Sequence, residues 1–182
     1  VPLQTSENTG GWWLEQHAAR GPVAEQGSGR AVRYLVVDSA ALDREVTFVG
    51  GLTLYYRLVE REAHPGQTLV LDLAWQASRP LPADLTAYLH LLSAEGQVVA
   101  QTDGDPQNGL RPFSSLASGE RLRCQRTLTV PEDAISGSYA VRLGVYERET
   151  GERSRLAEDR TEDGVTIVIV DVVPLVSGDG VP

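Results

Sequence analysis

Residues 65–77 read PGQTLVLDLAWQA, and this stretch decides the fold. Its first two residues, Pro65 and Gly66, predict a turn, because proline fixes φ and glycine tolerates a positive φ. Beyond the turn, apolar and mixed positions alternate along the chain: Leu69, Leu71, Leu73 and Trp75 against Val70, Asp72, Ala74 and Gln76. A period of two predicts a β-strand that buries one face.

The same alternation recurs along the rest of the chain. It is found in VTFVGGLTLYYRLV (46–59), LTAYLHLLS (85–93), QVVAQTD (97–103), RLRCQRTLTV (121–130), YAVRLGVYE (139–147) and VTIVIVDVV (165–173). Turn signals separate these segments at intervals of roughly 8–12 residues, which is typical of sandwiches and barrels. We therefore predict an all-β protein, a β-sandwich of about eight or nine antiparallel strands. An immunoglobulin-like topology and a jelly roll both fit the pattern.

The first part of the chain differs in composition from the rest. Residues 1–30 are rich in Gly, Ser, Gln and Glu and contain two adjacent tryptophans, Trp12 and Trp13. We predict an arm or linker there, since chain ends are often loosely held. The sandwich domain is expected over residues 31–176, with a short tail over 177–182. The sequence contains no Met, so we expect it to be a piece of a longer protein.

Composition narrows the choice of partners. The net charge is −9, and because a phosphate backbone repels such a surface, we expect no nucleic-acid partner. The longest apolar run, residues 165–176, is interrupted by Asp171 and Pro174 and is shorter than the roughly 18 residues that span a bilayer. We therefore expect no membrane insertion by this segment. The single cysteine, Cys124, lies within a strand pattern and is predicted to be a small buried hydrophobe.

Three pieces of the sequence are more specific than the alternation alone. They are PGQTLVLDLAW, HLLSAEGQVVAQTD and GSYAVRLGVYERETGER. With their surroundings, over residues 45–173, they resemble the C-terminal extracytoplasmic β-sandwich appended to bacterial membrane glycosyltransferases of the dolichyl-phosphate-mannose mannosyltransferase-like type. The resemblance implies a location outside the cytoplasm, at the cell surface or in a periplasm-like space. It implies no catalytic residue, because in that family the catalytic residues lie in the membrane-embedded part.

The residues themselves show no catalytic arrangement. The histidines, His17, His64 and His90, are far apart, and there is no nucleophile elbow, P-loop or dinucleotide-binding motif. The 25 carboxylates contain no pair that the pattern singles out for glycoside hydrolysis. We therefore predict that the chain is not an enzyme, that it has no catalytic residues and that it needs no cofactor.

Calcium is the one metal for which the sequence offers a candidate site. Asp103, Asp105 and Asn108 in the stretch DGDPQNG place oxygen ligands close together on a glycine-bearing loop. The spacing is not that of an EF-hand. Asp and Asn side chains that hydrogen-bond to their own backbone produce the same pattern.

Aromatic residues are the candidates for ligand binding, because sugars stack on flat exposed rings. The candidates are Trp12, Trp13, Tyr55, Tyr56, Tyr88 and Tyr146. Tyr55 and Tyr56 are adjacent, so one of them must face outward from a regular strand, whereas Trp75 and Tyr139 share their faces with apolar stripes and are assigned to the core. The sequence thus predicts a non-catalytic accessory or interaction module of a larger extracytoplasmic or membrane-associated protein, in contact with the other domains of that protein. The alternative is a carbohydrate-binding module that uses exposed aromatics on one sheet.

Overall fold

The computed structural model describes residues 18–26, 29–36, 42–81 and 84–174. The strands in these ranges are β1 (Ala18–Gln26), β2 (Gly29–Val36), β3 (Arg44–Phe48), β4 (Leu52–Tyr56), β5 (Val59–Ala63), β6 (Thr68–Ala77), β7 (Leu85–Leu92), β8 (Val98–Gly104), β9 (Arg121–Thr129), β10 (Gly137–Glu147) and β11 (Gly164–Val172). Two short 3₁₀ helices, η2 (Pro106–Gly109) and η3 (Phe113–Ser115), lie between β8 and β9. Over the described ranges, no helix has the length and apolar character needed to cross a membrane.

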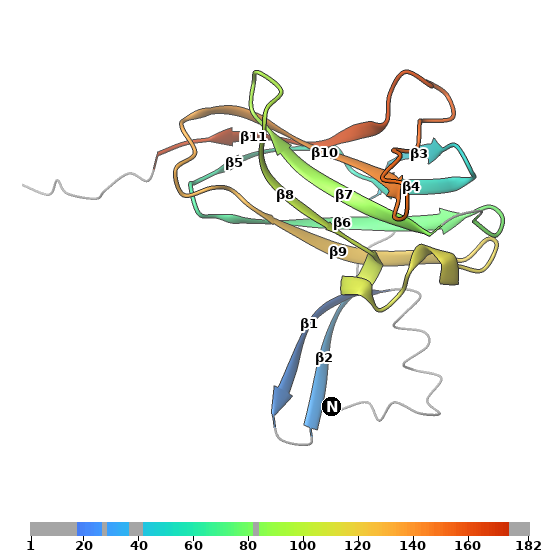
Figure 1. Ribbon diagram of the computed structural model, residues 1–182. Helices are drawn as coiled ribbons and strands as arrows, with labels where there is room; N and C mark the ends of the chain where they lie inside the picture. The colour runs from blue at the N-terminus through green and yellow to red at the C-terminus, as the bar shows by residue number, and fades with distance from the viewer. Residues whose placement is uncertain (1–17, 27–28, 37–41, 82–83, 175–182) are drawn as a thin grey trace, which may run out of the picture.

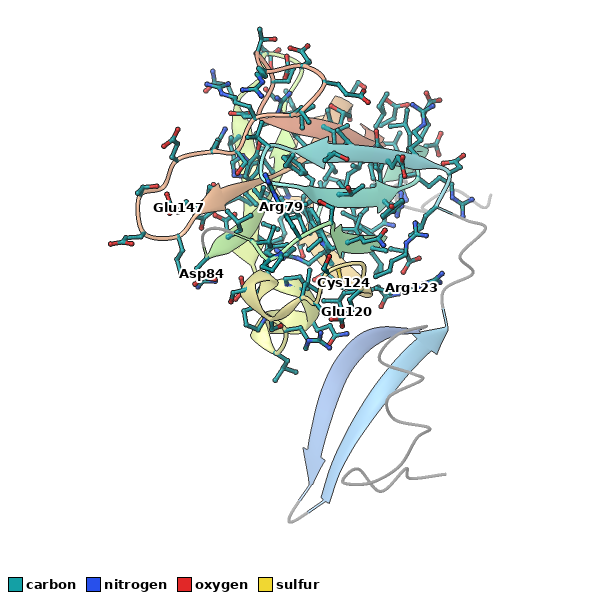
Figure 2. The ribbon with its side chains drawn as sticks, turned by 90° about the vertical axis from the view of Figure 1, so that its right-hand side faces the viewer. Arg79, Asp84, Glu120, Arg123, Cys124 and Glu147 are labelled. Atoms are coloured by element: carbon teal, nitrogen blue, oxygen red, sulfur yellow. The ribbon has the colours of Figure 1, made fainter. Side chains whose placement is uncertain are left out.

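Two sheets pack face to face and make up the body of the protein (Figure 1). The strand order is β5-β11-β10-β7-β8 in the five-stranded sheet and β3-β4-β6-β9 in the four-stranded sheet. The predicted all-β sandwich is therefore confirmed. β1 and β2 pair only with each other and form a hairpin that projects from the body in both views (Figure 1, Figure 2).

One strand pair departs from the predicted antiparallel arrangement. β5 runs parallel to β11, with Val59 opposite Val168 and Ala63 opposite Val172. The cause is the two-residue link after Tyr56, where the chain leaves β4 and enters the other sheet as β5 without a hairpin turn. The prediction of antiparallel strands throughout is wrong for this edge strand, because alternation reports the buried face and not the strand direction.

The pairing order is that of an immunoglobulin-like sandwich, and so it decides between the two predicted topologies. β6 pairs with β9 in one sheet, while β7, β10 and β11 are neighbours in the other, which corresponds to the B–E and C–F–G pairs of that fold. The Tyr139 hydroxyl at the start of β10 donates a hydrogen bond to the Ile135 carbonyl at 3.0 Å, as in the tyrosine corner of immunoglobulin domains. Tyr139 is buried, as predicted.

The core lies between the two sheets, and β6 supplies its central stripe. The stripe consists of Leu69, Leu71, Leu73 and Trp75, all of them buried as the alternation predicts. The Trp75 ring meets the Phe113 ring nearly edge-on, with the centroids 4.9 Å apart, and lies 6.2 Å from the Phe48 ring. Short η3 thus closes one side of the core by inserting its aromatic residue.

The N-terminal hairpin begins before the expected domain boundary. β2 starts at Gly29, so the expected division between residues 30 and 31 falls inside the hairpin. The two packed sheets begin at Arg44, and β1 lies beside β9 and η2. Trp12 and Trp13, together with the expected tail over 177–182, lie outside the described residues.

Candidate binding groove between the two sheets

Tyr88 was expected to present an outward ring, and the structure shows it buried. It lies on the outer face of the five-stranded sheet, yet it is only 1% exposed. The ring crosses Gly144 of β10 and Gly164 of β11, where an added Cβ would collide with the Tyr88 hydroxyl. That hydroxyl donates a hydrogen bond to the Asp163 carbonyl at 3.0 Å. The expected exposure of Tyr88 is wrong, because glycines on two neighbouring strands let the ring lie flat against the sheet.

Charged side chains close over the Tyr88 ring. The Arg153 guanidinium carbon lies 4.5 Å from the ring centroid. Arg142 and Arg153 donate to the Asp163 carboxylate at 3.1 and 3.3 Å. The His90 ring packs beside Tyr88 with the centroids 4.6 Å apart, and its burial, together with the charge of Arg153, lowers the pKa of His90. The ion pairs hold the segment before β11 against the sheet.

Tyr55 and Tyr56 divide between the two faces of β4, as their adjacency predicts. Tyr56 is 6% exposed and belongs to the core. Tyr55 faces outward, but the Arg121 guanidinium lies 3.5 Å over its ring centroid, and its hydroxyl donates to the Gln76 side chain at 2.8 Å. No aromatic side chain with described burial is more than partly exposed. The stacking surface that the carbohydrate alternative needs is therefore covered at Tyr55, Tyr56 and Tyr88.

The two aspartates of the expected calcium loop already have protein partners. Arg148 Nη2 donates to both oxygens of the Asp105 carboxylate at 2.7 and 2.8 Å. The Tyr146 hydroxyl donates to Asp103 Oδ2 at 3.2 Å. In the part of the chain that the structure describes, no three His, Cys, Asp or Glu side chains gather as metal ligands. The side chain of Asn108 is not described, and calcium binding stays a prediction.

Cys124 behaves as the predicted hydrophobe. It lies inside the sandwich, opposite Leu73, and is fully buried (Figure 2). Burial raises the pKa of its thiol to about 12. The thiol is therefore un-ionised at neutral pH, whereas the nucleophilic form of cysteine is the thiolate.

One open edge of the sandwich, between β9 and β8, is closed by an arginine. Arg126 lies on the inward face of β9, opposite Leu71 of β6. Its guanidinium crosses to the other sheet and donates to the Gly104 and Thr102 carbonyls of β8 at 2.6 and 2.9 Å. Burial lowers the pKa of Arg126. Main-chain acceptors of the facing strand thus compensate the buried charge.

At the opposite edge, the described strands leave the first half of β6 without a neighbour on one side. β4 pairs with β6 only from Ala74 to Ala77, because the chain leaves β4 after Tyr56 and continues in the other sheet. No described strand pairs with residues 68–73 on this side. Among the described strands, β9 is therefore the single neighbour of the first half of β6.

Three residues of this half-strand direct their main-chain groups to the open side. The Val130 N–H donates to the Gln67 carbonyl at 2.9 Å on the β9 side. Main-chain groups alternate between the two sides of an antiparallel strand. Thr68, Val70 and Asp72 therefore direct their N–H and C=O groups away from β9, where they have no strand partner among the described residues.

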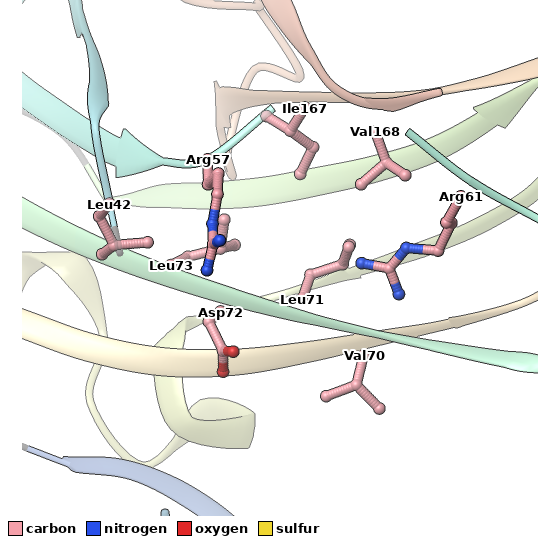
Figure 3. A pocket seen from close by; sticks show the side chains of 9 residues that line it. All are labelled: Leu42, Arg57, Arg61, Val70, Leu71, Asp72, Leu73, Ile167 and Val168. Atoms are coloured by element: carbon pink, nitrogen blue, oxygen red, sulfur yellow. The ribbon is translucent and has the colours of Figure 1, made fainter. Parts of the chain in front are cut away.

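A pocket of about 260 Å³ lies beside this half-strand, between the two sheets (Figure 3). Its apolar lining consists of Leu42, Val70, Leu71, Leu73, Ile167 and Val168. Its polar lining consists of Arg57, Arg61 and Asp72, and Figure 3 shows both guanidinium groups reaching into it. Asp72 accepts a hydrogen bond from the Gln125 side chain at 3.0 Å. We call this pocket, with the open half of β6, the edge groove.

Arg61 occupies a core-facing position of β5. It alternates with Ala63, which is buried, and lies opposite the buried Val170 of β11, whereas Glu60 and Glu62 are exposed. The Arg61 Nε is buried and has no hydrogen-bond partner among the described residues. A buried donor without an acceptor is rare and unfavourable. Within the part of the chain that the structure describes, the edge groove thus combines an unpaired half-strand edge, an apolar lining and a cationic donor without an acceptor.

Sequence reasoning assigned no function to these residues. The available signal was VEREA (59–63), in which Arg61 takes the position that strand alternation gives to the core. An arginine at this position indicates a binding site only if the first half of β6, across the opening, lacks a strand neighbour. The pairing of β6 depends on how the sheets assemble and cannot be inferred from residues 59–63 alone.

Comparisons with known proteins assign the chain to no family. No protein-family model matches it, and no curated protein matches it. Among solved structures, it is similar to a family 123 glycoside hydrolase from Clostridium perfringens, with a TM-score of 0.39 and 15% identity over 65% of this chain and 23% of that one. It is also similar to the alkylpurine DNA glycosylase AlkC of Pseudomonas fluorescens, solved bound to DNA containing an abasic site analog, with a TM-score of 0.40 and 12% identity over 74% and 32% of the two chains. The chain therefore spans about a third of either neighbour or less, and likenesses at this level carry no activity over to it.

Proposed function

We propose that the chain is a non-catalytic interaction module of a larger protein, and that it holds an extended segment of another polypeptide at the edge groove. The observation that supports this proposal is the open half of β6, where Thr68, Val70 and Asp72 direct main-chain donors and acceptors to a side with no described strand. On the resemblance alone, we also propose an extracytoplasmic location in a membrane-associated bacterial protein.

The physical basis is strand addition. An extended peptide that pairs with an exposed sheet edge gains main-chain hydrogen bonds, while adjacent pockets select its side chains. Natural proteins usually protect such edges with charges, prolines or covering elements. Here the edge carries Val70, which is 44% exposed and lines the pocket, so an added strand would cover apolar surface as well as pair its backbone.

A proline substitution tests the proposal by removing a single main-chain N–H group. Val70→Pro removes the N–H group that faces the open side and leaves the β6–β9 ladder unchanged, since the Val70 N–H does not point to β9. Val70→Thr is the matched control, because it keeps the N–H group and the branched side chain.

The measurement is selection of a library of short linear peptides against the purified chain, followed by hydrogen exchange. We expect selected peptides to slow exchange of the Val70 and Asp72 amides, to bind the Val70→Thr variant normally and to bind Val70→Pro about tenfold more weakly or worse. Absence of any binder, or binders that are indifferent to Val70→Pro, would show that the edge groove does not add a strand.

A further inference from the structure

Two arginines point inward from edge strands, one at each open side of the sandwich. Arg126 does so on β9 and Arg61 on β5. Both occupy positions that a sandwich normally gives to an apolar side chain, since Cys124 and Leu128 on either side of Arg126 are buried, as is Ala63 two residues after Arg61. Each open side of the sandwich therefore has an arginine that points inward from an edge strand.

The surroundings of the two guanidinium groups differ. Arg126 donates to two carbonyls of the strand that faces it. Within the described ranges, the buried Nε of Arg61 has no acceptor, and the first half of β6, across the opening, has no strand neighbour on that side. Arg57 lies beside Arg61 in the same pocket and takes part in no ion pair within the described ranges. The edge groove thus holds two cations and few acceptors.

We propose that the segment bound in the edge groove is acidic, and that a carboxylate of that segment accepts hydrogen bonds from Arg61, with Arg57 beside it. This inference rests on the proposed strand addition. A carboxylate matches the planar fork of a guanidinium and can accept from two of its donors at once. The nearby Asp72 does not supply this acceptor, because no ion pair joins it to either arginine and it accepts from Gln125.

The pocket wall sets the second property of the segment. Leu71, Leu73 and Ile167 are buried and line the base of the pocket next to the two guanidinium groups. Side chains two positions apart in a strand lie on the same face. The bound strand should therefore carry an apolar residue two positions from its acidic residue, one side chain against the wall and the other against Arg61.

Removal of one positive charge at the edge groove provides the test. The variant is Arg61→Gln, and its control is Arg160→Gln, which removes the same charge from an exposed position on the segment between β10 and β11. The probes are the strongest peptide from the selection above and the same peptide with its acidic residue replaced by the corresponding amide. Urea unfolding of both variants verifies that each is folded.

We expect Arg61→Gln to raise the Kd of the acidic peptide about tenfold or more, and Arg160→Gln to leave it unchanged. The amide peptide should bind all three proteins with the same reduced affinity. Equal affinities of the acidic and amide peptides, for a peptide that Val70→Pro still blocks, would overturn the acidic preference and leave strand addition standing. Failure of every peptide to bind would overturn both.

Discussion

Replacing Gly144 by alanine should destabilise the fold through Tyr88. A Cβ at this position would meet the Asp163 carbonyl and the Tyr88 ring at distances that real Cβ atoms do not adopt. Overpacking a buried position costs about 1–3 kcal/mol, and displacing the Tyr88 hydroxyl from Asp163 removes a hydrogen bond that contributes about 1 kcal/mol. We therefore expect Gly144→Ala to lose about 2–4 kcal/mol, a fall in Tm of roughly 5–15 °C for a chain of this size.

The assay is urea unfolding followed by circular dichroism, with two comparisons. Gly151→Ala serves as the control, because Gly151 has a φ of +71° but nothing within 4 Å of an added Cβ, so only backbone strain of about 1 kcal/mol is expected. In the second comparison, Gly144→Ala is combined with Tyr88→Leu, and the double variant should be more stable than the sum of the single losses by over about 1 kcal/mol. Additive losses, or a Gly144→Ala effect within about 0.5 kcal/mol of the parent, would refute the account of Tyr88 packing.

Three further predictions concern single side chains. Because burial lowers the pKa of His90, the folded state favours the neutral ring, so its contribution to stability is complete above the unfolded-state pKa of about 6.5 and is lost as the pH falls below it. Unfolding free energies measured across pH should therefore fall more steeply on the acid side for the parent than for His90→Gln, and parallel curves would contradict this. Cys124, with a thiol pKa of about 12, should react with a thiol reagent only after urea unfolds the chain, and rapid labelling of the native protein would show the burial to be wrong. Arg126→Met should lose about 2 kcal/mol because two hydrogen bonds to a buried cation disappear, whereas Arg61→Met should be neutral or stabilising because it removes an unsatisfied donor. Equal losses in the two methionine variants would show that Arg61 is satisfied in solution.

The elements that the sequence predicts best are those whose pattern reports burial directly. The stripe from Leu69 to Trp75 alternates without interruption, and each of its apolar residues is buried as expected. The adjacency of Tyr55 and Tyr56 likewise predicts one inward and one outward ring, because neighbouring side chains in a strand must face opposite ways. Both inferences need only local geometry.

Predictions fail where burial depends on residues that are distant in the sequence. Alternation places Tyr88 opposite the core-facing residues of β7, and that assignment is correct. Its burial, however, depends on Gly144 and Gly164 in two other strands and on Arg153 above the ring. The sequence does not show that these residues contact Tyr88 until the strand order β11-β10-β7 is known. From the sequence alone, a tyrosine on the outer face of a strand is therefore predicted to be exposed.

The role of the arginines at the edge groove also depends on residues that are distant in the sequence. Arg61 and Arg126 are one residue type at equivalent inward positions of edge strands, and their sequence contexts do not separate a structural arginine from a binding one. The difference lies in the strand across each opening. Carbonyls of β8 accept hydrogen bonds from Arg126, whereas the first half of β6, across from Arg61, has no described neighbour on its open side. A buried cationic donor is stabilised only when acceptors surround it. The Nε of Arg61 and the first half of β6 both lack a partner among the described residues, and they are two aspects of one incomplete edge. A single acidic strand bound there would supply the acceptors for the arginine and a second neighbour for β6.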